Sequence, residues 1–239
     1  MAVAVLVVAA RTAAGGGFLE GAPVERRIEL SGVEAIDIDA AHFTVEVLGA
    51  PELDTVTVVS RMSTRFHRFH DGHVAVERSD GAASVSVRYD GRPLSKAAVT
   101  WGPLLVLQVP ERTALAVTTT AGDVRIHDLT ASHVTITTTA GDLYLSDVTA
   151  TVAISARAGF IVLERVHGPK GITADSGSIE VSDSRGDLFT DTGGEQRLRR
   201  IDGDVSVAST DRLTLTDHRG SLTIRKGAMP SRTGDQVSE

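Results

Sequence analysis

The first candidate for chemistry is a histidine-rich segment. His67, His70 and His73, with Asp71 between them, form the pattern H-x-x-H-D-G-H. Imidazole and carboxylate groups bind zinc, and the same set can take nickel or copper. At strand spacing His70 points away from His67 and His73, so the ligands converge only if the segment is a loop. We interpret it as a polar insertion loop and predict no metal site and no cofactor.

Two aspartates occupy equivalent places in a repeated string, since TTTAGD ends at Asp123 and again at Asp142. Stacked carboxylates could share a Ca²⁺ ion, or act as acid and base on a polysaccharide as in hydrolytic β-helices. The equivalent positions in later repeats carry Phe160, Ser178, Glu195 and Arg212. The acidic column does not continue, so we interpret both aspartates as turn-capping residues that follow glycine.

Two further motifs are charged. Arg185-Gly186-Asp187 is a tripeptide that some cell-surface receptors read, and it also suits a turn between repeats. A basic patch for an acidic glycan or a phospholipid headgroup could be formed by Arg197, Arg199, Arg200 and Arg212. We interpret the tripeptide as a turn and the arginines as a solvated face that neighbouring acids partly neutralise.

Composition excludes several classes of protein. The 239 residues include no cysteine, which excludes disulfides, thiolate metal sites and cysteine nucleophiles. The net charge of −7 argues against a nucleic-acid binder, and the 41 % of apolar residues is enough for a folded core. The sequence contains no G-x-S-x-G elbow, P-loop or dinucleotide-binding glycine motif. We therefore predict no catalytic residues and no enzyme activity.

An internal repeat of about 18 residues begins near Thr113. Its small turns centre on Gly122, Gly141, Gly159, Gly177, Gly194 and, in the sixth place, Asp211. A column before each turn contains Val117, Ile136, Ile154, Ile172, Phe189 and Val207. Two columns after it contain Val124, Leu143, Ile161, Ile179, Gln196, Leu213 and Ile126, Leu145, Leu163, Val181, Leu198, Leu215.

The repeat alternates apolar and polar residues, as a strand with one buried face does. A unit this short cannot bury its apolar side alone, but stacked units make a continuous core. The pattern predicts an all-β, single-stranded β-solenoid, a right-handed β-helix of about 18-residue rungs. An antiparallel β-sandwich of hairpins is the alternative, and it does not explain six turns with matched columns.

A charge pattern follows the same repeat. Six residues after each turn stand Asp128, Asp147, Arg165, Asp183, Arg200 and Asp217. From Asp147 onward the signs alternate. We predict that Arg165 lies between Asp147 and Asp183 at one corner of the stack, which leaves the opposite flank as the binding surface.

The chain divides into four predicted parts. Residues 1–25 form a signal-like, anchor-like or disordered arm, and residues 26–112 form irregular β coils that cap the stack. Residues 113–225 form the regular solenoid, and residues 226–239 form a disordered tail. The nine-residue step from Ile36 and Ile38 to Val45 and Val47 matches that of the repeat. This step predicts that the solenoid begins near Val33.

The first ten residues, MAVAVLVVAA, are all apolar. They are too few to span a bilayer and have the length of a signal-peptide core, although no positively charged segment precedes them. We predict an exported or membrane-tethered protein with a possible membrane tether at the N-terminus. A strand-like or disordered arm, with a cytoplasmic location, is the alternative.

The segment LLVLQVPERTALAVTTTAGDVRI, followed by TITTTAGDLYLSDV and ITADSGSIEVSDS, resembles the bacterial putative-adhesin domain family. The resemblance covers roughly residues 33–225. It implies a β-helical domain that is often exported or membrane-tethered, and it brings no catalytic residues. This chain departs from the pattern after Gly177, and Lys170 replaces an apolar residue in the column of Leu115, Val134 and Val152.

Three functions remain open. The first is a non-catalytic envelope or surface module that binds a glycan or protein partner through its flank. The second is a scaffold or signalling accessory in the envelope-stress response. The third, a β-helix polysaccharide lyase or hydrolase, needs a cleft that these uniform, short-looped repeats do not predict.

Overall fold

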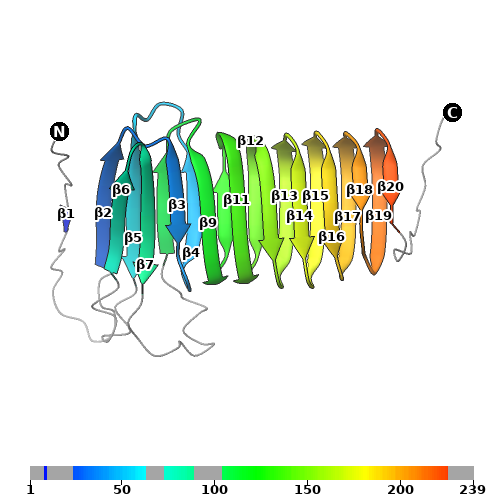
Figure 1. The fold of residues 1–239 in the computed structure, drawn as a ribbon, viewed down its shortest axis with the longest axis horizontal. Coiled ribbons are helices and arrows are strands. Elements are labelled where there is room, and N and C mark those ends of the chain that lie inside the picture. The colour runs from blue at the N-terminus through cyan, green and yellow to red at the C-terminus, as the bar shows by residue number, and fades with distance from the viewer. Residues whose placement is uncertain (1–7, 10–23, 63–72, 89–103, 226–239) are drawn as a thin grey trace, which may run out of the picture.

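The computed structural model describes Val8–Ala9 and residues 24–62, 73–88 and 104–225, where every regular element is a β-strand (Figure 1). The N-terminal strands are β1 (Val8–Ala9), β2 (Val24–Ser31), β3 (Ala35–Asp39), β4 (Thr44–Gly49), β5 (Thr55–Met62), β6 (His73–Ser79), β7 (Ala82–Arg88) and β8 (Leu104–Val109). The next are β9 (Ala114–Ala121), β10 (Val124–His127), β11 (Thr130–Ala140), β12 (Leu143–Ala156), β13 (Phe160–His167) and β14 (Lys170–Ala174). The last are β15 (Ser178–Arg185), β16 (Leu188–Thr192), β17 (Glu195–Asp202), β18 (Val205–Val207), β19 (Arg212–Arg219) and β20 (Leu222–Ile224). The predicted all-β solenoid of about 18-residue rungs is confirmed.

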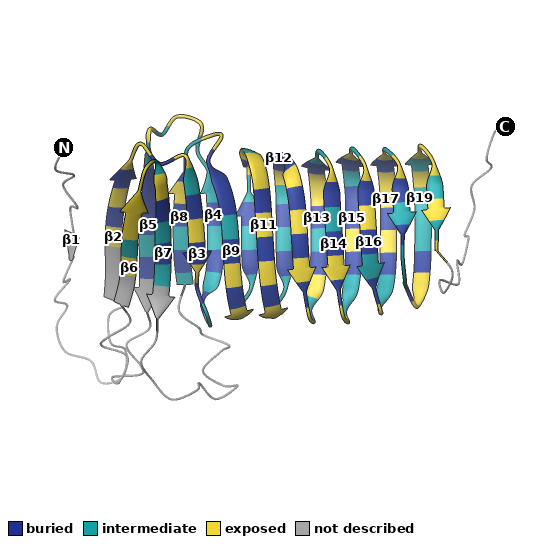
Figure 2. Cartoon of the chain, in the orientation of Figure 1, coloured by how far each residue is buried: buried dark blue, intermediate teal, exposed yellow. Residues whose placement is uncertain are grey.

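Each rung has two long sides, which we call face A and face B. Parallel pairing on face A runs in the order β8, β4, β10, β12, β13, β15, β17, β19. On face B it runs β7, β3, β9, β11, β12, β14, β16, β18, β20. The long strand β12 turns a corner and contributes to both faces. Side chains alternate between the interior and the surface, which gives the banded burial of Figure 2.

The columns of apolar residues predicted after the turn are in register on face A. Val124 pairs with Leu143, Leu143 with Ile161 and Ile161 with Ile179, and Gln196 and Leu213 continue the column. The glycine turns allow the rungs to approach closely. At Gly159 the backbone has φ +128°, and a Cβ atom would lie 2.2 Å from the Gly141 carbonyl oxygen. A side chain there would therefore force two rungs apart.

The column predicted before the turn is correct except at one position. Ile154 pairs with Ile172 as expected, but Ile172 pairs with Thr190, and Phe189 points outward and is 37 % exposed. The rung contains 18 residues here, whereas the prediction counted 17, and a slip of one residue exchanges the two sides of a strand. Buried Thr190 is accommodated because its hydroxyl donates a 2.6 Å hydrogen bond to Gln196 Oε1. The amide nitrogen of Gln196 in turn donates to the Ser209 carbonyl at 2.9 Å.

The N-terminal end is closed by antiparallel strands. On face A, β5 pairs antiparallel with both β2 and β8, and on face B β6 and β7 form a hairpin. The solenoid already begins between these strands and the repeat. Ile36 and Ile38 pair with Leu115 and Val117, and Val45 pairs with Val124, which confirms the nine-residue step. The short strand β1 pairs with β2.

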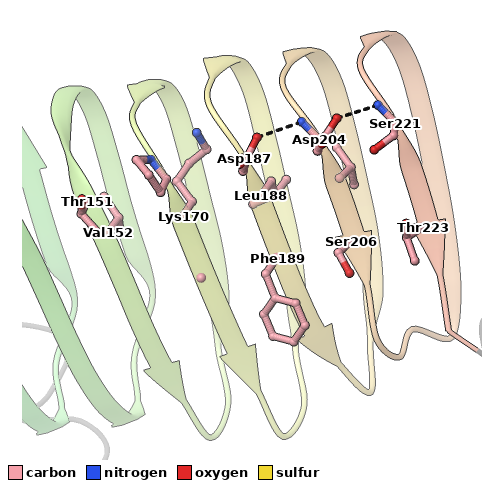
Figure 3. A pocket seen from close by; sticks show the side chains of 13 residues that line it. Thr151, Val152, Lys170, Asp187, Leu188, Phe189, Asp204, Ser206, Ser221 and Thr223 are labelled. Atoms are coloured by element: carbon pink, nitrogen blue, oxygen red, sulfur yellow. Dashed lines mark hydrogen bonds between the residues drawn. The ribbon is translucent and has the colours of Figure 1, made fainter.

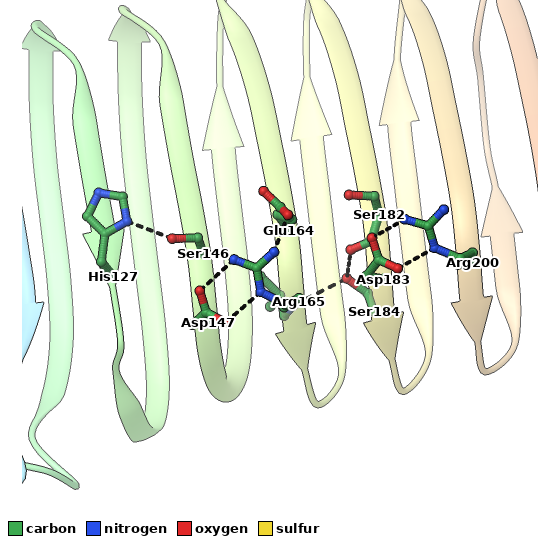
Figure 4. A network of polar contacts seen from close by, with 10 residues as sticks. His127, Ser146, Asp147, Glu164, Arg165, Ser182, Asp183, Ser184 and Arg200 are labelled. Carbon is green, nitrogen blue, oxygen red and sulfur yellow. Dashed lines mark hydrogen bonds and ion pairs between the residues drawn. The ribbon is translucent and has the colours of Figure 1, made fainter.

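The predicted charge ladder lies at the corner that follows face A (Figure 4). Arg165 Nε and Nη2 donate to the two carboxylate oxygens of Asp147 at 2.6 and 2.7 Å, and Arg200 holds Asp183 in the same bidentate way. These hydrogen bonds lower the pKa of both aspartates, and the charge of Arg165 also acts on Asp183. The sequence did not indicate the backbone conformation, which is left-handed at all six ladder positions, with φ between 52° and 56°.

Several predictions lie outside the described residues. These are His67, His70 and Asp71, most of the 1–25 arm and the whole 226–239 tail. For His73 the structure gives the backbone pairing with Arg88 and nothing of its side chain.

Candidate functional site

A hollow of about 480 Å³ lies on the outer surface of face B, toward the C-terminal end (Figure 3). It crosses five strands, β12, β14, β16, β18 and β20. The side chains that matter below belong to Lys170, Asp187, Phe189, Asp204, Ser206 and Thr223. Face B follows the ladder corner along the chain, as β16 follows β15.

Phe189 and Gly171 give the hollow its shape. The two residues pair across β14 and β16, and Phe189 is one of two large apolar side chains that are exposed among the described residues. A Cβ atom on Gly171 would have no atom within 4 Å, so neither its backbone conformation nor crowding requires glycine there. Glycine weakens a strand, and within one it often marks a site where another molecule approaches closely. The pair therefore presents an aromatic ring beside an open floor.

Two carboxylates line the same hollow. Asp187 Oδ1 accepts a hydrogen bond from the Asp204 amide at 3.2 Å, and Asp204 Oδ1 accepts one from the Ser221 amide at 2.8 Å. The hydrogen bonds from Ser221 lower the pKa of Asp204, so this group is ionised at neutral pH. The Asp187 carboxylate accepts no further hydrogen bond from the described residues. The upper edge of the hollow thus carries fixed hydrogen-bond acceptors.

Lys170 lies beneath this edge and is only 3 % exposed. Its ammonium group donates to the carbonyls of Gly168 and Arg185, both at 2.7 Å, and lies 3.3 to 3.4 Å from those of Gly186 and Val166. Burial lowers its pKa to about 8, an effect that the charge of Asp187 opposes. The side chain stands in the predicted column between Val152 and Leu188 and holds the corner together from inside.

The two repeat aspartates lie on adjacent rungs of face A, as predicted. Asp123 Oδ1 accepts from the Asp142 amide at 3.1 Å, and Asp142 Oδ1 accepts from the Phe160 amide at 2.9 Å. Asp123 also pairs with Arg125 at 3.0 Å, and the Arg125 guanidinium lies 5.7 Å from the centre of the Tyr144 ring. Each carboxylate caps the following rung, in agreement with the turn-capping interpretation.

The Arg185-Gly186-Asp187 turn is built into the scaffold. The Arg185 carbonyl accepts from Lys170, Gly186 has φ +93° against the backbone of Gly168, and Asp187 holds the next rung. Each of the three residues therefore contributes a contact to the stacking of the rungs.

The four arginines that we interpreted as a solvated face lie on the paired strands β17 and β19. Arg197 pairs with Glu195 at 3.3 Å and Arg200 pairs with Asp183, while Arg212 lies in register with Glu195. Arg199 faces outward between them and its charge acts on Asp183. Neighbouring acids thus offset much of the positive charge.

In the part of the chain that the structure describes, no three His, Asp or Glu side chains gather as metal ligands would. Nor does it contain a helix with the length and apolarity needed to cross a membrane.

A family model described as Toastrack DUF4097 matches residues 68–225, which is more than half of the chain. The chain belongs to the Toastrack DUF4097 family. This agrees with the resemblance to putative-adhesin domains that the repeat residues carry. No curated protein matches the sequence.

Several solved bacterial structures align with most of this Toastrack chain. A putative adhesin from Bacteroides fragilis NCTC 9343 is 11 % identical, with a TM-score of 0.40 over 89 % of this chain and 97 % of that one. A putative cell adhesion protein from Clostridium sporogenes ATCC 15579 is 9 % identical, with a TM-score of 0.42 over 88 % and 99 %. A putative lipid binding protein from Parabacteroides distasonis ATCC 8503 is 10 % identical, with a TM-score of 0.40 over 90 % and 98 %.

The sequence pattern did not indicate the face B hollow of this Toastrack domain. Phe189 was assigned to the core because an aromatic residue fits an apolar column better than the threonine that follows it. The signal that could have found the site was the neighbouring Gly171, a glycine inside a strand and away from the predicted turns.

Proposed function

We propose that this protein is a non-catalytic surface module that binds a glycan through the face B hollow. The observation that carries the proposal is Phe189, an aromatic ring that stands outside the core beside the open floor at Gly171. The apolar face of a sugar ring packs against an aromatic side chain, and the sugar hydroxyls can donate to fixed carboxylates. Asp187, Asp204 and the hydroxyls of Ser206 and Thr223 supply polar partners around that ring.

The charge of the hollow selects the class of glycan. Its exposed charged groups are the carboxylates of Asp187 and Asp204, whereas the ammonium of Lys170 is buried under main-chain carbonyls. Acidic glycans would meet like charges there. We therefore propose a neutral or amino-sugar glycan.

The same contacts support a binding role over catalysis. A general acid needs a raised pKa, but hydrogen bonds lower that of Asp204. Lys170 is buried, and main-chain carbonyl groups hold its ammonium group. The proposal places the protein at the cell envelope, in line with the apolar run of residues 1–10. Fractionation of native cells tests that location, and recovery in the cytoplasm alone would overturn it.

The binding experiment compares two phenylalanines on opposite faces. Oligosaccharides of cellulose, chitin, deacetylated chitosan and polygalacturonate are titrated into wild-type protein, Phe189→Ser and Phe160→Ser. Phe160 is 60 % exposed on face A and serves as the matched control. We expect a neutral or amino-sugar ligand to lose at least about tenfold in affinity with Phe189→Ser alone, equivalent to one aromatic contact. Equal losses in both variants, or binding of polygalacturonate alone, would contradict the assignment.

A further inference from the structure

A second hollow, of about 440 Å³, lies on face B near the N-terminal end. Its floor includes Asp37, Ser84 and Ala116, and its far side is formed by the β6–β7 hairpin with Glu77 and Arg78. The last residue toward the C-terminal end is His133 on β11.

The two hollows are neighbours on face B. His133, which lines the second hollow, pairs in register with Thr151, which lines the first. Both hollows occupy the same two rows of outward residues, and those rows run across every strand of face B. The first row contains Ala82, Ala35, Ala114, His133, Thr151, Pro169, Asp187, Asp204 and Ser221. The second contains Ser84, Asp37, Ala116, Thr135, Ala153, Gly171, Phe189, Ser206 and Thr223.

We propose that these rows form one track that holds a linear glycan chain along the solenoid axis. The inference rests on the proposed glycan-binding function and adds that the ligand is a polymer with a second subsite at His133 and Asp37. Nine strands at a spacing of ~4.8 Å give the track a length of about 38 Å. Between the hollows the second row carries Thr135 and Ala153, whose small side chains do not obstruct a chain that lies along the row.

The direction of the track favours a glycan over a peptide. An extended peptide gains affinity by adding its backbone to a free sheet edge. The track instead crosses the strands at right angles, where their backbone groups are already paired with neighbouring rungs. Recognition must therefore come from outward side chains, which here are hydroxyls, carboxylates, an imidazole and a phenyl ring.

The charge of the second hollow agrees with that of the first. Asp37 and Glu77 carry its negative charge, and the Arg78 guanidinium is turned to the main-chain carbonyl oxygens of Ser31 and Gly32. Both ends of the track thus suit the same neutral or amino-sugar chain.

The test measures how affinity depends on chain length. Deacetylated chitosan oligomers, from the dimer to chains longer than the track, are titrated into the wild-type protein and three variants. Ala153→Arg obstructs the path between the hollows, and Ser155→Arg adds the same charge on β12 outside the two rows. His133→Ser alters the second subsite without touching the first hollow.

We expect the dimer to bind wild type and Ser155→Arg with equal affinity. Long chains should gain at least tenfold in wild type and in Ser155→Arg, and lose that gain in Ala153→Arg and His133→Ser. A dimer that binds through Phe189, with no gain for long chains or an equal gain in all variants, would overturn the track and leave the proposed function standing. Failure of every length to bind, together with failure of the cellulose and chitin oligosaccharides, would overturn both.

Discussion

Faces A and B share one core and one repeat, yet they use their outer charges differently. On face A and its corner, cations and anions neutralise each other, as in Arg165 with Asp147 and Arg125 with Asp123. On face B, Asp187 and Asp204 accept main-chain amides and face a hollow beside an exposed ring. Charges that are paired in register stabilise a scaffold, whereas exposed carboxylates that main-chain amides hold in place remain available to a ligand.

The largest expected effect on stability concerns the core that both faces share. Ile154 on the inner side of face B and Ile161 on the inner side of face A are both buried. Changing either to Asp places a carboxylate in the core without a partner, and we expect a loss on the order of 4 kcal/mol in unfolding free energy. Ser155→Asp, one residue along and outward, should unfold like wild type. Urea denaturation measures all three, and a stable Ile154→Asp protein would refute the register.

Lys170 tests the corner under the face B hollow. Its pKa is about 8 in the folded protein against an ordinary 10.5, so between these values the unfolded chain binds the proton and the folded chain does not. Stability should therefore rise from pH 8 toward pH 10, by on the order of 2 kcal/mol. Lys170→Met should lack this rise. The series stops at pH 10 because desolvation raises the pKa of Tyr144, whose titration lowers stability beyond that point. Parallel pH profiles would contradict the assignment.

Arg165 tests the neutralised corner beside face A. Arg165→Glu places three acids in succession, and we expect a melting temperature lower by a few degrees, with a smaller loss in high salt. Arg165→Asn also removes the ion pair, but asparagine tolerates the left-handed backbone at φ +54°. It should therefore melt above Arg165→Ala. The reverse order would mean that tolerance of the left-handed backbone does not decide which residue suits this position.

The smallest effect on stability separates folding from binding on face B. Gly171→Val meets no atom and adds a residue that favours strands, so stability should stay unchanged or rise by about 0.5 kcal/mol. The side chain would fill the hollow beside Phe189, and glycan binding should fall at least tenfold. Gly159→Val is the contrast, since its crowded turn predicts a large loss in melting temperature. Unchanged glycan binding by Gly171→Val would contradict the proposal that the glycan lies over Gly171.

The amino-acid sequence by itself determined the repeat, the inward columns and the charge ladder. Each depends on spacing alone, because residues one rung apart become neighbours in a parallel stack. The nine-residue step at Ile36 and Val45 placed the first rung for the same reason.

Only the tertiary structure decided which residues leave the core. Phe189 and Thr190 differ by one position, and the hydrogen bond from Thr190 to Gln196 makes the polar residue the buried one. That bond joins two polar side chains across the turn between β16 and β17, and the apolar spacing of the repeat does not report a polar pair. The hollow has the same origin, because it forms where outward residues from separate rungs meet across Gly171. The periodicity of the sequence determines which positions of a solenoid are buried. Its outer surface depends on which side chains the packing of the interior leaves exposed.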